Sequence, residues 1–144
     1  MNNKKKKISV MIPCYNEVEN IEGITSAVDR ILKAELSQYD YEIVVIDNAS
    51  DDGTRDVIRD VCEKNKHIKA IFNVTNFGQF NSPFHGICEC TGDCVIPICA
   101  DFQDPPELIP VFVKEWEKGH KIVSGVKTSS KENPAIYWMR SMYY

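Results

Sequence analysis

Short runs of apolar, often β-branched residues alternate along the chain with stretches in which apolar residues recur every three or four positions. Such runs between turn residues are typical of buried strands, and the wider spacing is typical of amphipathic helices. The predicted strands are 8–12, 41–46, 68–73, 94–100 and 121–126. The predicted helices are 21–32, 54–65, 83–90 and 105–118.

This order of elements predicts an α/β fold with a mostly parallel sheet and helices on both faces. Asn16 or Asn20 is expected to cap the first helix. Asp104 is expected to cap the last one, with Pro105 at its first position. Pro97 lacks the amide donor that a ladder needs, so one side of the fourth strand is expected to be unpaired or bulged.

The length of 144 residues is typical of one domain with a buried core. We assign residues 1–7 to a basic flexible tail, 8–126 to a single domain and 127–144 to the start of a further region. That last segment carries apolar residues that look like the beginning of a packed helix and then stops. We therefore expect the chain to be truncated at its C-terminal end.

Charge and composition narrow the classes of partner. The chain has 17 Lys+Arg against 21 Asp+Glu, a net charge of −4, which argues against a nucleic-acid binder. No apolar run approaches the ~20 residues that cross a bilayer, and no secretory signal is visible. We expect a cytoplasmic protein, in which the lysines at 4–7 form a solvated tail or touch the inner face of a membrane. Without a signal, the six cysteines are expected to be free thiols.

Polar clusters follow each of the first four predicted strands. They are 13–17, 47–53, 76–79 and 101–104. Open α/β sheets bind ligands at the carboxyl ends of their strands, and two of these clusters are acidic. Crowded carboxylates repel one another unless a cation binds them, so the pattern predicts Mg²⁺ or Mn²⁺ shared with a phosphate-bearing ligand. Taken singly, each cluster also fits a mere turn or helix cap.

Several well-known phosphate and nucleophile motifs are missing. The turn after the first strand is Pro13-Cys-Tyr, where a dinucleotide site would have G-x-G-x-x-G. The chain has no G-x-x-x-x-G-K-[ST] loop and no G-x-S-x-G elbow. Phosphates are therefore not expected to be held by a glycine-rich loop.

Four segments together resemble the family 2 glycosyltransferases of the GT-A fold. They are ISVMIPCYNE at 8–17, VVIDNASDDGT at 44–54, Asn76-Phe-Gly with the later Gly86 and Thr91-Gly-Asp93, and DFQDPPE at 101–107. The likeness runs from about Ile8 to Val126. The last segment is similar to the metal-site segment of the subgroup that glycosylates polyprenyl phosphates.

The resemblance implies an enzyme that moves a sugar from a UDP- or GDP-sugar to a polyprenyl phosphate or saccharide acceptor, with metal assistance and inversion. The residues implied to bind the nucleotide sugar are Pro13, Tyr15, Glu17, Asp47, Asn48, Asn76, Gly78 and Asp101. Asp47 is implied to contact the base and Asp101 to ligate the metal, with Cys99 and Asp104 as further candidate ligands. The family's general base is expected beyond Tyr144.

This sequence departs from the family pattern at a few positions. Cys99 stands where the metal motif has an aspartate, and Asn48 replaces the second aspartate of the second-strand signature. These departures leave two alternatives open, a non-catalytic nucleotide-sugar-binding module and a nucleotidyltransferase. An exposed apolar edge, where the rest of such an enzyme would pack, is expected to favour a homo-oligomer.

Overall fold

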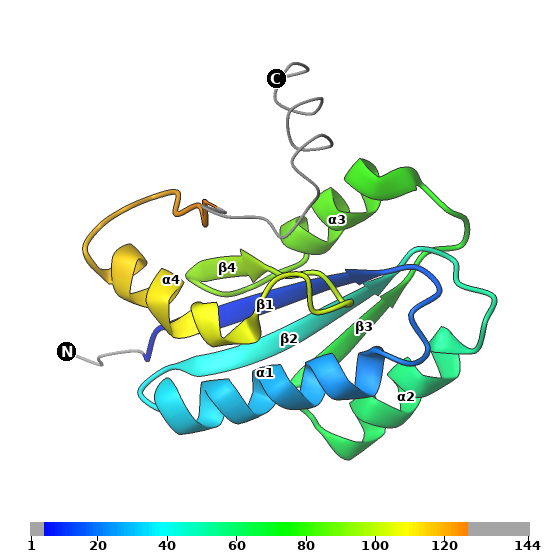
Figure 1. The fold of residues 1–144 in the computed structure, drawn as a ribbon, viewed down its shortest axis with the longest axis horizontal. Helices are drawn as coiled ribbons and strands as arrows, with labels where there is room; N and C mark the ends of the chain where they lie inside the picture. Colours follow the sequence, from blue (N-terminus) through cyan, green and yellow to red (C-terminus); the bar gives the residue numbers. More distant parts are fainter. Residues whose placement is uncertain (1–4, 127–144) are drawn as a thin grey trace, which may run out of the picture.

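The computed structural model describes residues 5–126, which form nine helices and strands built around one β-sheet (Figure 1). The strands are β1 (Lys7–Cys14), β2 (Asp40–Asp47), β3 (Ile68–Phe72) and β4 (Cys94–Pro97). The helices are α1 (Ile21–Glu35), α2 (Thr54–Lys64), α3 (Gly78–Cys88), the 3₁₀ turn η1 (Pro106–Leu108) and α4 (Ile109–Glu117).

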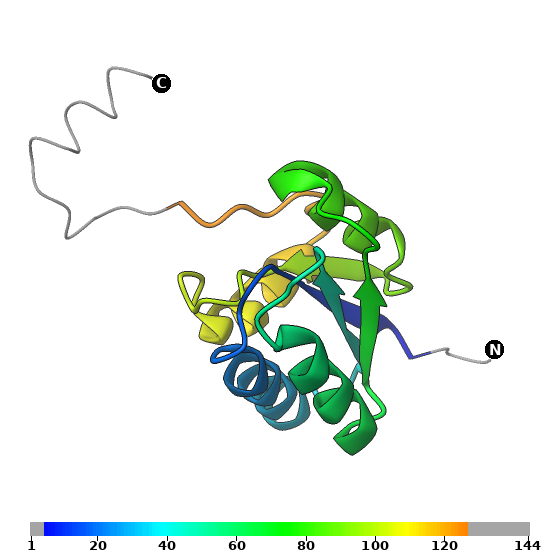
Figure 2. The same ribbon diagram turned by 90° about the vertical axis from the view of Figure 1, so that its right-hand side faces the viewer.

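All four strands run parallel, in the order β3-β2-β1-β4. Helices α1, α2 and α4 lie on one face of the sheet and α3 lies on the other (Figure 2). The prediction of a parallel sheet covered on both faces is therefore confirmed. Because both faces are covered, the central strands are apolar throughout, as buried parallel strands usually are.

Alternate residues of β1 serve the two faces of the sheet. Ile8, Val10 and Ile12 are fully buried in the main core beneath α1. On the opposite face, a Cβ added to Gly86 of α3 would lie 2.9 Å from a methyl of Ile46 and 3.1 Å from Met11. Helix α3 therefore approaches the sheet too closely for any side chain at that position.

A buried carboxylate joins the amino-terminal halves of β1 and β2. Glu42 is 1% exposed, and its Oε1 accepts hydrogen bonds from Ser9 Oγ (2.7 Å) and from the Thr91 amide (2.7 Å). Its Oε2 accepts from Lys7 Nζ (2.9 Å) and Lys69 Nζ (2.6 Å). These bonds connect three strands and the turn before β4, at the end of the sheet opposite the polar clusters.

Three predicted elements differ from those observed. No strand forms in residues 121–126, where Ile122 and Val126 are 87% and 81% exposed, so the predicted fifth strand is wrong. Helix α3 begins at Gly78 rather than at Pro83, which lies inside it. The last helix is not capped by Asp104, because a 3₁₀ turn intervenes before α4.

The two prolines within the strands, Pro13 and Pro97, lie where the hydrogen-bond ladder needs no backbone N–H donor. Ile98 N–H donates to the Met11 carbonyl, which turns the nitrogen of Pro97 away from β1. Among residues 5–126, β4 pairs only with β1, as the proline predicted. Asn48 N–H donates to the Cys14 carbonyl, so the nitrogen of Pro13 faces the side on which β4 has already ended. Strand β1 can therefore continue through its proline.

The structure also bears on the predictions about membrane-spanning segments and about the cysteines. Within residues 5–126, the helices are too short or too polar to span a bilayer. All six cysteines are free thiols. The region predicted at 127–144 and most of the basic tail lie outside the described residues.

Candidate functional site

The loops that follow β1, β2 and β4 each contain a residue with an unusual backbone. Asn16 (φ 56°), Ala49 (φ 66°) and Phe102 (φ 59°) adopt the left-handed region, which side chains other than glycine seldom occupy. Such conformations persist only where the surroundings enforce them, and they gather at binding sites. All three lie at the carboxyl edge of the sheet, where the polar clusters were predicted to meet.

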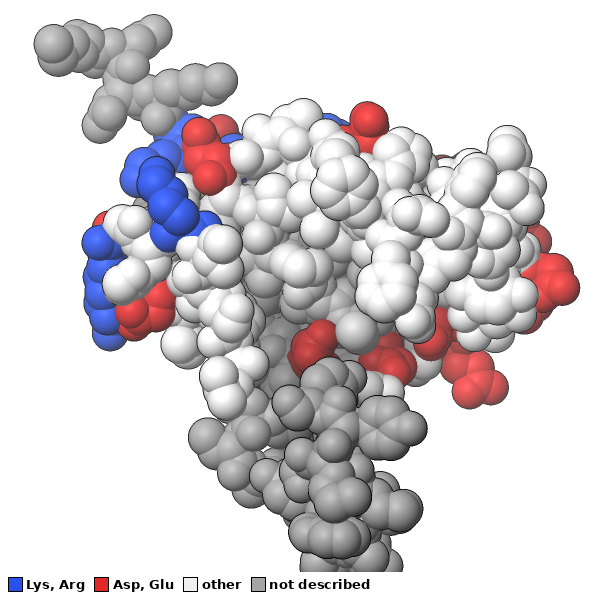
Figure 3. Space-filling view, turned by 90° about the horizontal axis from the view of Figure 1, so that it is seen from above, with Lys and Arg blue, Asp and Glu red and all other residues white. Residues whose placement is uncertain are grey.

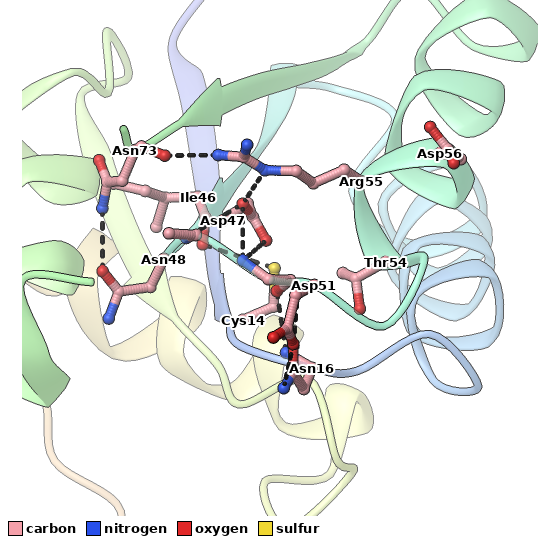
Figure 4. A network of polar contacts seen from close by, with 12 residues as sticks. Cys14, Asn16, Ile46, Asp47, Asn48, Asp51, Thr54, Arg55, Asp56 and Asn73 are labelled. Carbon is pink, nitrogen blue, oxygen red and sulfur yellow. Dashed lines mark hydrogen bonds and ion pairs between the residues drawn. The ribbon is translucent and has the colours of Figure 1, made fainter. Parts of the chain in front are cut away.

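Hydrogen bonds clasp the first loop to the second (Figure 4). The Asn16 amide donates to Ser50 Oγ (2.8 Å), and its side chain exchanges two bonds with Asp51. The Glu17 amide donates to the hydroxyl of Thr54 at the start of α2 (2.8 Å). The neighbouring Tyr15 is 49% exposed, whereas Glu17 is half-buried and its Oε2 accepts a hydrogen bond from Asn20 Nδ2 (2.6 Å).

Asp47, at the end of β2, is fully buried. Its carboxylate accepts hydrogen bonds from the amides of Ala49 and Ser50 and from Arg55 Nε (2.7 Å). The Arg55 guanidinium also donates to the Asn73 carbonyl (Figure 4). The carboxylate is therefore already occupied by two backbone amides of the turn and by Arg55. The predicted contact with a nucleotide base would require these groups to rearrange.

The side chain of Asn48 organises the third loop and the first turn of α3. Asn48 Nδ2 donates to Asn76 Oδ1 (2.9 Å), and Asn48 Oδ1 accepts from the Phe77 amide (2.9 Å) and from Asn73 Nδ2 (3.2 Å). Asn76 Oδ1 also accepts from the amide of Gly78, whose φ of 84° suits glycine. The structure therefore joins Asn48, Asn76 and Gly78 by hydrogen bonds at this edge of the sheet.

The fourth loop presents Asp101 and Asp104 to solvent. Asp101 Oδ1 accepts only a local bond, from the Gln103 amide (3.1 Å), whereas Asp104 Oδ2 accepts from the Cys99 amide (3.2 Å). Burial, the hydrogen bond to Asp104 and the charges of Asp104, Asp101 and Glu17 together raise the pKa of the Cys99 thiol to about 11. The thiol is therefore protonated at neutral pH, and Glu17 of the first loop lies within electrostatic reach of the fourth.

The same acidic field acts on Cys14, which ends β1. Burial raises the pKa of this thiol, and the charges of Asp47, Glu17 and Asp52 raise it further. Like charges from two loops therefore converge beneath the site. This convergence is the electrostatic setting that favours a bound cation.

The fourth loop offers an exposed carboxylate to a divalent metal. Among residues 5–126, no three His, Cys, Asp or Glu side chains are arranged to hold an ion. Mg²⁺ at phosphate sites is commonly bound by one or two carboxylates, with the substrate's phosphates and water completing its shell. Asp101 is exposed and has no ion pair within the described residues, so it fits that arrangement. Cys99, with its raised pKa, fits it poorly.

Sequence reasoning missed Arg55, Asn73, Ser50 and Ser82. Asn73 Nδ2 bridges Asn48 to Ser82 Oγ (2.9 Å), and Arg55 neutralises Asp47. The only local signal was for Arg55, a cation eight residues after a carboxylate that ends a strand. Ser50 lies within the predicted polar cluster 47–53, but its contact with Asn16, like the contacts of Asn73 and Ser82, joins separate segments, which no local pattern shows.

The chain resembles known proteins in both sequence and fold. The chain is 35% identical over 136 residues to the undecaprenyl-phosphate 4-deoxy-4-formamido-L-arabinose transferase of Enterobacter sp. (strain 638), covering 93% of this chain and 39% of that protein. It also resembles the Pyrobaculum calidifontis mannosyltransferase PcManGT, solved with GDP-Man and Mn²⁺ (TM-score 0.61, 24% identity, 78% of this chain and 32% of that one).

A second solved structure, S. aureus TarS 1–349, has a TM-score of 0.63 at 23% identity, over 88% of this chain and 40% of that one. These neighbours show the GT-A fold. Glycosyl transferase family 2 matches residues 9–144. The chain therefore belongs to glycosyl transferase family 2, and it spans about two fifths of the length of the relatives described.

Proposed function

We propose that this chain forms the donor-binding part of a glycosyltransferase that transfers a sugar from a UDP- or GDP-sugar to a polyprenyl phosphate, with metal assistance and inversion at the anomeric carbon. The observation that carries the proposal is the convergence of loops after β1, β2 and β4 on one edge of the sheet. That edge combines enforced left-handed residues with the exposed Tyr15 and Asp101 and the half-buried Glu17.

The chemistry of these side chains suits a nucleotide diphosphate sugar. The half-exposed ring of Tyr15 offers a flat apolar face to a base, and the carboxylate of Glu17 accepts hydrogen bonds from ribose hydroxyls. Asp101 would hold the metal together with the diphosphate. A bound Mg²⁺ or Mn²⁺ would offset negative charge on the departing nucleoside diphosphate. We expect that cation to be needed, because the chain is acidic overall and Asp101 forms no ion pair with Lys or Arg within the described residues.

The acceptor follows from chemistry and from the relative's name. A phosphate acceptor is already an anion, so it needs no strong general base. A saccharide hydroxyl would need one, and we place that base outside residues 5–126. An undecaprenyl-phosphate transferase shares 35% identity with this chain, which favours the polyprenyl phosphate. Because such an acceptor is lipid-linked, we propose that the protein works at a membrane surface, on its cytoplasmic side.

One observation favours a second candidate, a nucleotide-sugar-binding module that does not catalyse transfer. Cys99 occupies the position of a family metal ligand, and its thiol stays protonated beside Asp104. A protein with a weakened metal site would bind the nucleotide without stabilising the leaving group. The two candidates differ in turnover, not in the fold or in the location of the site.

Calorimetric titration with UDP and GDP, with and without Mn²⁺, tests the proposal. We expect Mn²⁺ to tighten nucleotide binding at least about tenfold, and Asp101→Asn to remove that gain. Asp56→Asn, on the outer surface of α2, is the matched control and should keep it. Cys99→Asp should increase the metal effect. Equal binding with and without Mn²⁺ in both the wild type and Cys99→Asp would refute the metal site.

Turnover is then measured with UDP- and GDP-sugars and a short polyprenyl phosphate. Consumption of the sugar nucleotide supports the transferase. Metal-dependent binding without turnover, in the same chain, supports the binding module.

A further inference from the structure

Helix α3 presents a continuous apolar stripe to solvent. Phe77, Phe80, Phe84 and Ile87 are 48%, 78%, 68% and 38% exposed. Their spacing of three, four and three residues places them on one side of the helix. We call these four residues the α3 aromatic face. Large exposed aromatic side chains in a row are uncommon on a surface that only meets water.

The α3 aromatic face is also poor in charge. His85 is the only titratable nitrogen or carboxyl group within the helix, and it faces Glu89 across 3.8 Å. Figure 3, which looks onto this side of the molecule, shows a broad uncharged area bordered by acidic side chains and, along one edge, by Lys and Arg side chains as well. The described face can therefore make apolar contacts, but it has few charged groups that would select a particular partner.

The inner side of α3 is fixed, so the face cannot turn inward. Ser82 and Gly86 are buried against the sheet, and Gly86 has no room even for a methyl group. The first turn is held by Asn48, which accepts from the Phe77 amide. The same asparagine belongs to the candidate site. The aromatic face is thus rigidly placed beside the donor-binding loops.

Size favours a lipid surface over a second copy of the chain as the occupant. A helix of 11 residues is about 16 Å long. At about 200 Å² for each whole side chain, the four residues of the α3 aromatic face expose roughly 450 Å². A stable protein interface needs about 800 Å² from each partner. A bilayer has no such minimum, because a few aromatic side chains can enter the headgroup region on their own.

We propose that the α3 aromatic face docks this domain on a lipid bilayer by inserting its phenylalanines into the headgroup region. The inference rests on the proposed function, since an acceptor embedded in a membrane requires the donor site to approach that membrane. Helix α3 begins at the edge of the sheet that carries the site. Docking through α3 would bring this edge close to the lipid surface while its loops stay in water.

Vesicle co-sedimentation of the 144-residue chain tests the proposal, with POPC vesicles and with POPC/POPG vesicles. We expect binding to both, with little dependence on salt, because the contact is apolar. The double variant Phe80→Ser/Phe84→Ser should lower the partition coefficient at least about tenfold. Val111→Ser/Ile122→Ser, which removes two exposed apolar side chains elsewhere, should leave it unchanged.

Three results would overturn the proposal. One is equal binding by the phenylalanine variant and the control. Another is binding only to anionic vesicles that salt abolishes, which would assign the contact to the basic tail. The third is a dimer in sedimentation velocity that the phenylalanine variant dissociates, without vesicle binding. Nucleotide titration in the absence of lipid keeps the tests separate: vesicle binding without nucleotide binding refutes the proposed function, and the reverse refutes docking.

Discussion

Replacing Glu42 by glutamine removes one negative charge from the buried cluster and keeps the shape of the side chain. The amide oxygen can still accept from Ser9 and from the Thr91 amide, which lie on the inner side. The amide nitrogen then faces the ammonium groups of Lys7 and Lys69, which were 2.9 and 2.6 Å from the carboxylate. Because the amide nitrogen is itself a donor, it cannot accept from either ammonium group, and both charged hydrogen bonds are lost.

The size of the loss follows from the exposure of each partner. A hydrogen bond to a charged group contributes about 1.5–3 kcal/mol. Lys69 is 54% exposed and regains water, whereas Lys7 is only 28% exposed. We therefore expect Glu42→Gln to lower the free energy of unfolding by about 3 kcal/mol. With a urea dependence of about 1.5–2 kcal/mol per molar, the midpoint should fall by roughly 1.5–2 M.

The effect should also depend on pH. Burial raises the pKa of Glu42, but the hydrogen bonds from Lys69, Lys7, Ser9 and the Thr91 amide outweigh burial and hold it well below its usual range. A lowered pKa in the folded state stabilises the protein fully above the ordinary value of about 4.3. That stability is lost as the pH falls through the lowered pKa. The gap between the wild type and the variant should therefore be constant near neutral pH and shrink in acid.

Urea denaturation followed by circular dichroism between about pH 3 and 8 measures both quantities. Glu115→Gln is the control, because Glu115 pairs with Lys118 at the surface, and its midpoint should match that of the wild type. A midpoint for Glu42→Gln no lower than the control's would refute the reasoning. So would a gap that stays the same at every pH.

Three further predictions concern packing and reactivity. Gly86→Ala should cost about 1–3 kcal/mol because the methyl meets the sheet at 2.9 Å. Gly23→Ala, whose methyl meets nothing closer than 3.5 Å, should be neutral or stabilising; equal losses in thermal denaturation would contradict this. Arg55→Ala should cost about 2–4 kcal/mol by leaving a buried carboxylate unpaired, and a change within error would refute that role. Iodoacetamide should alkylate Cys99 faster as the pH approaches about 11, and Asp104→Asn should speed alkylation at a lower pH. Peptide mass mapping that shows equal rates would count against their hydrogen bond.

Much of the fold could be predicted because its strands are buried on both faces. The apolar runs that became β1 and β2 are visible without any knowledge of their partners. The run at 121–126 has the same composition, yet it forms no strand, because a strand requires a neighbour to pair with and composition does not reveal one. Helix α3 begins earlier than predicted because the side chains of Asn48, from another loop, and of Asn76, directly before the helix, bind its first turn.

The site could be predicted in outline for a similar reason. Parallel strands bring their carboxyl ends to one edge, so residues as distant as Tyr15 and Asp101 were expected there. What each side chain does at that edge depends on contacts across loops. Asp47 looked available to a ligand in sequence, but Arg55 and two backbone amides occupy it. Long-range hydrogen bonds of this kind have no signature in a single sequence.

The buried cluster around Glu42 and the edge that we propose binds the donor occupy opposite ends of the same sheet. One end concentrates opposite charges that neutralise each other, whereas the other leaves acidic groups facing outward. The groups that stabilise the fold and the groups that we propose bind the donor therefore lie in separate regions of a small domain. An engineer could raise heat tolerance by redesigning the amino-terminal half of β1, around Ser9, without changing the proposed metal ligand Asp101. The same separation would let the loops change specificity during evolution while the scaffold holds.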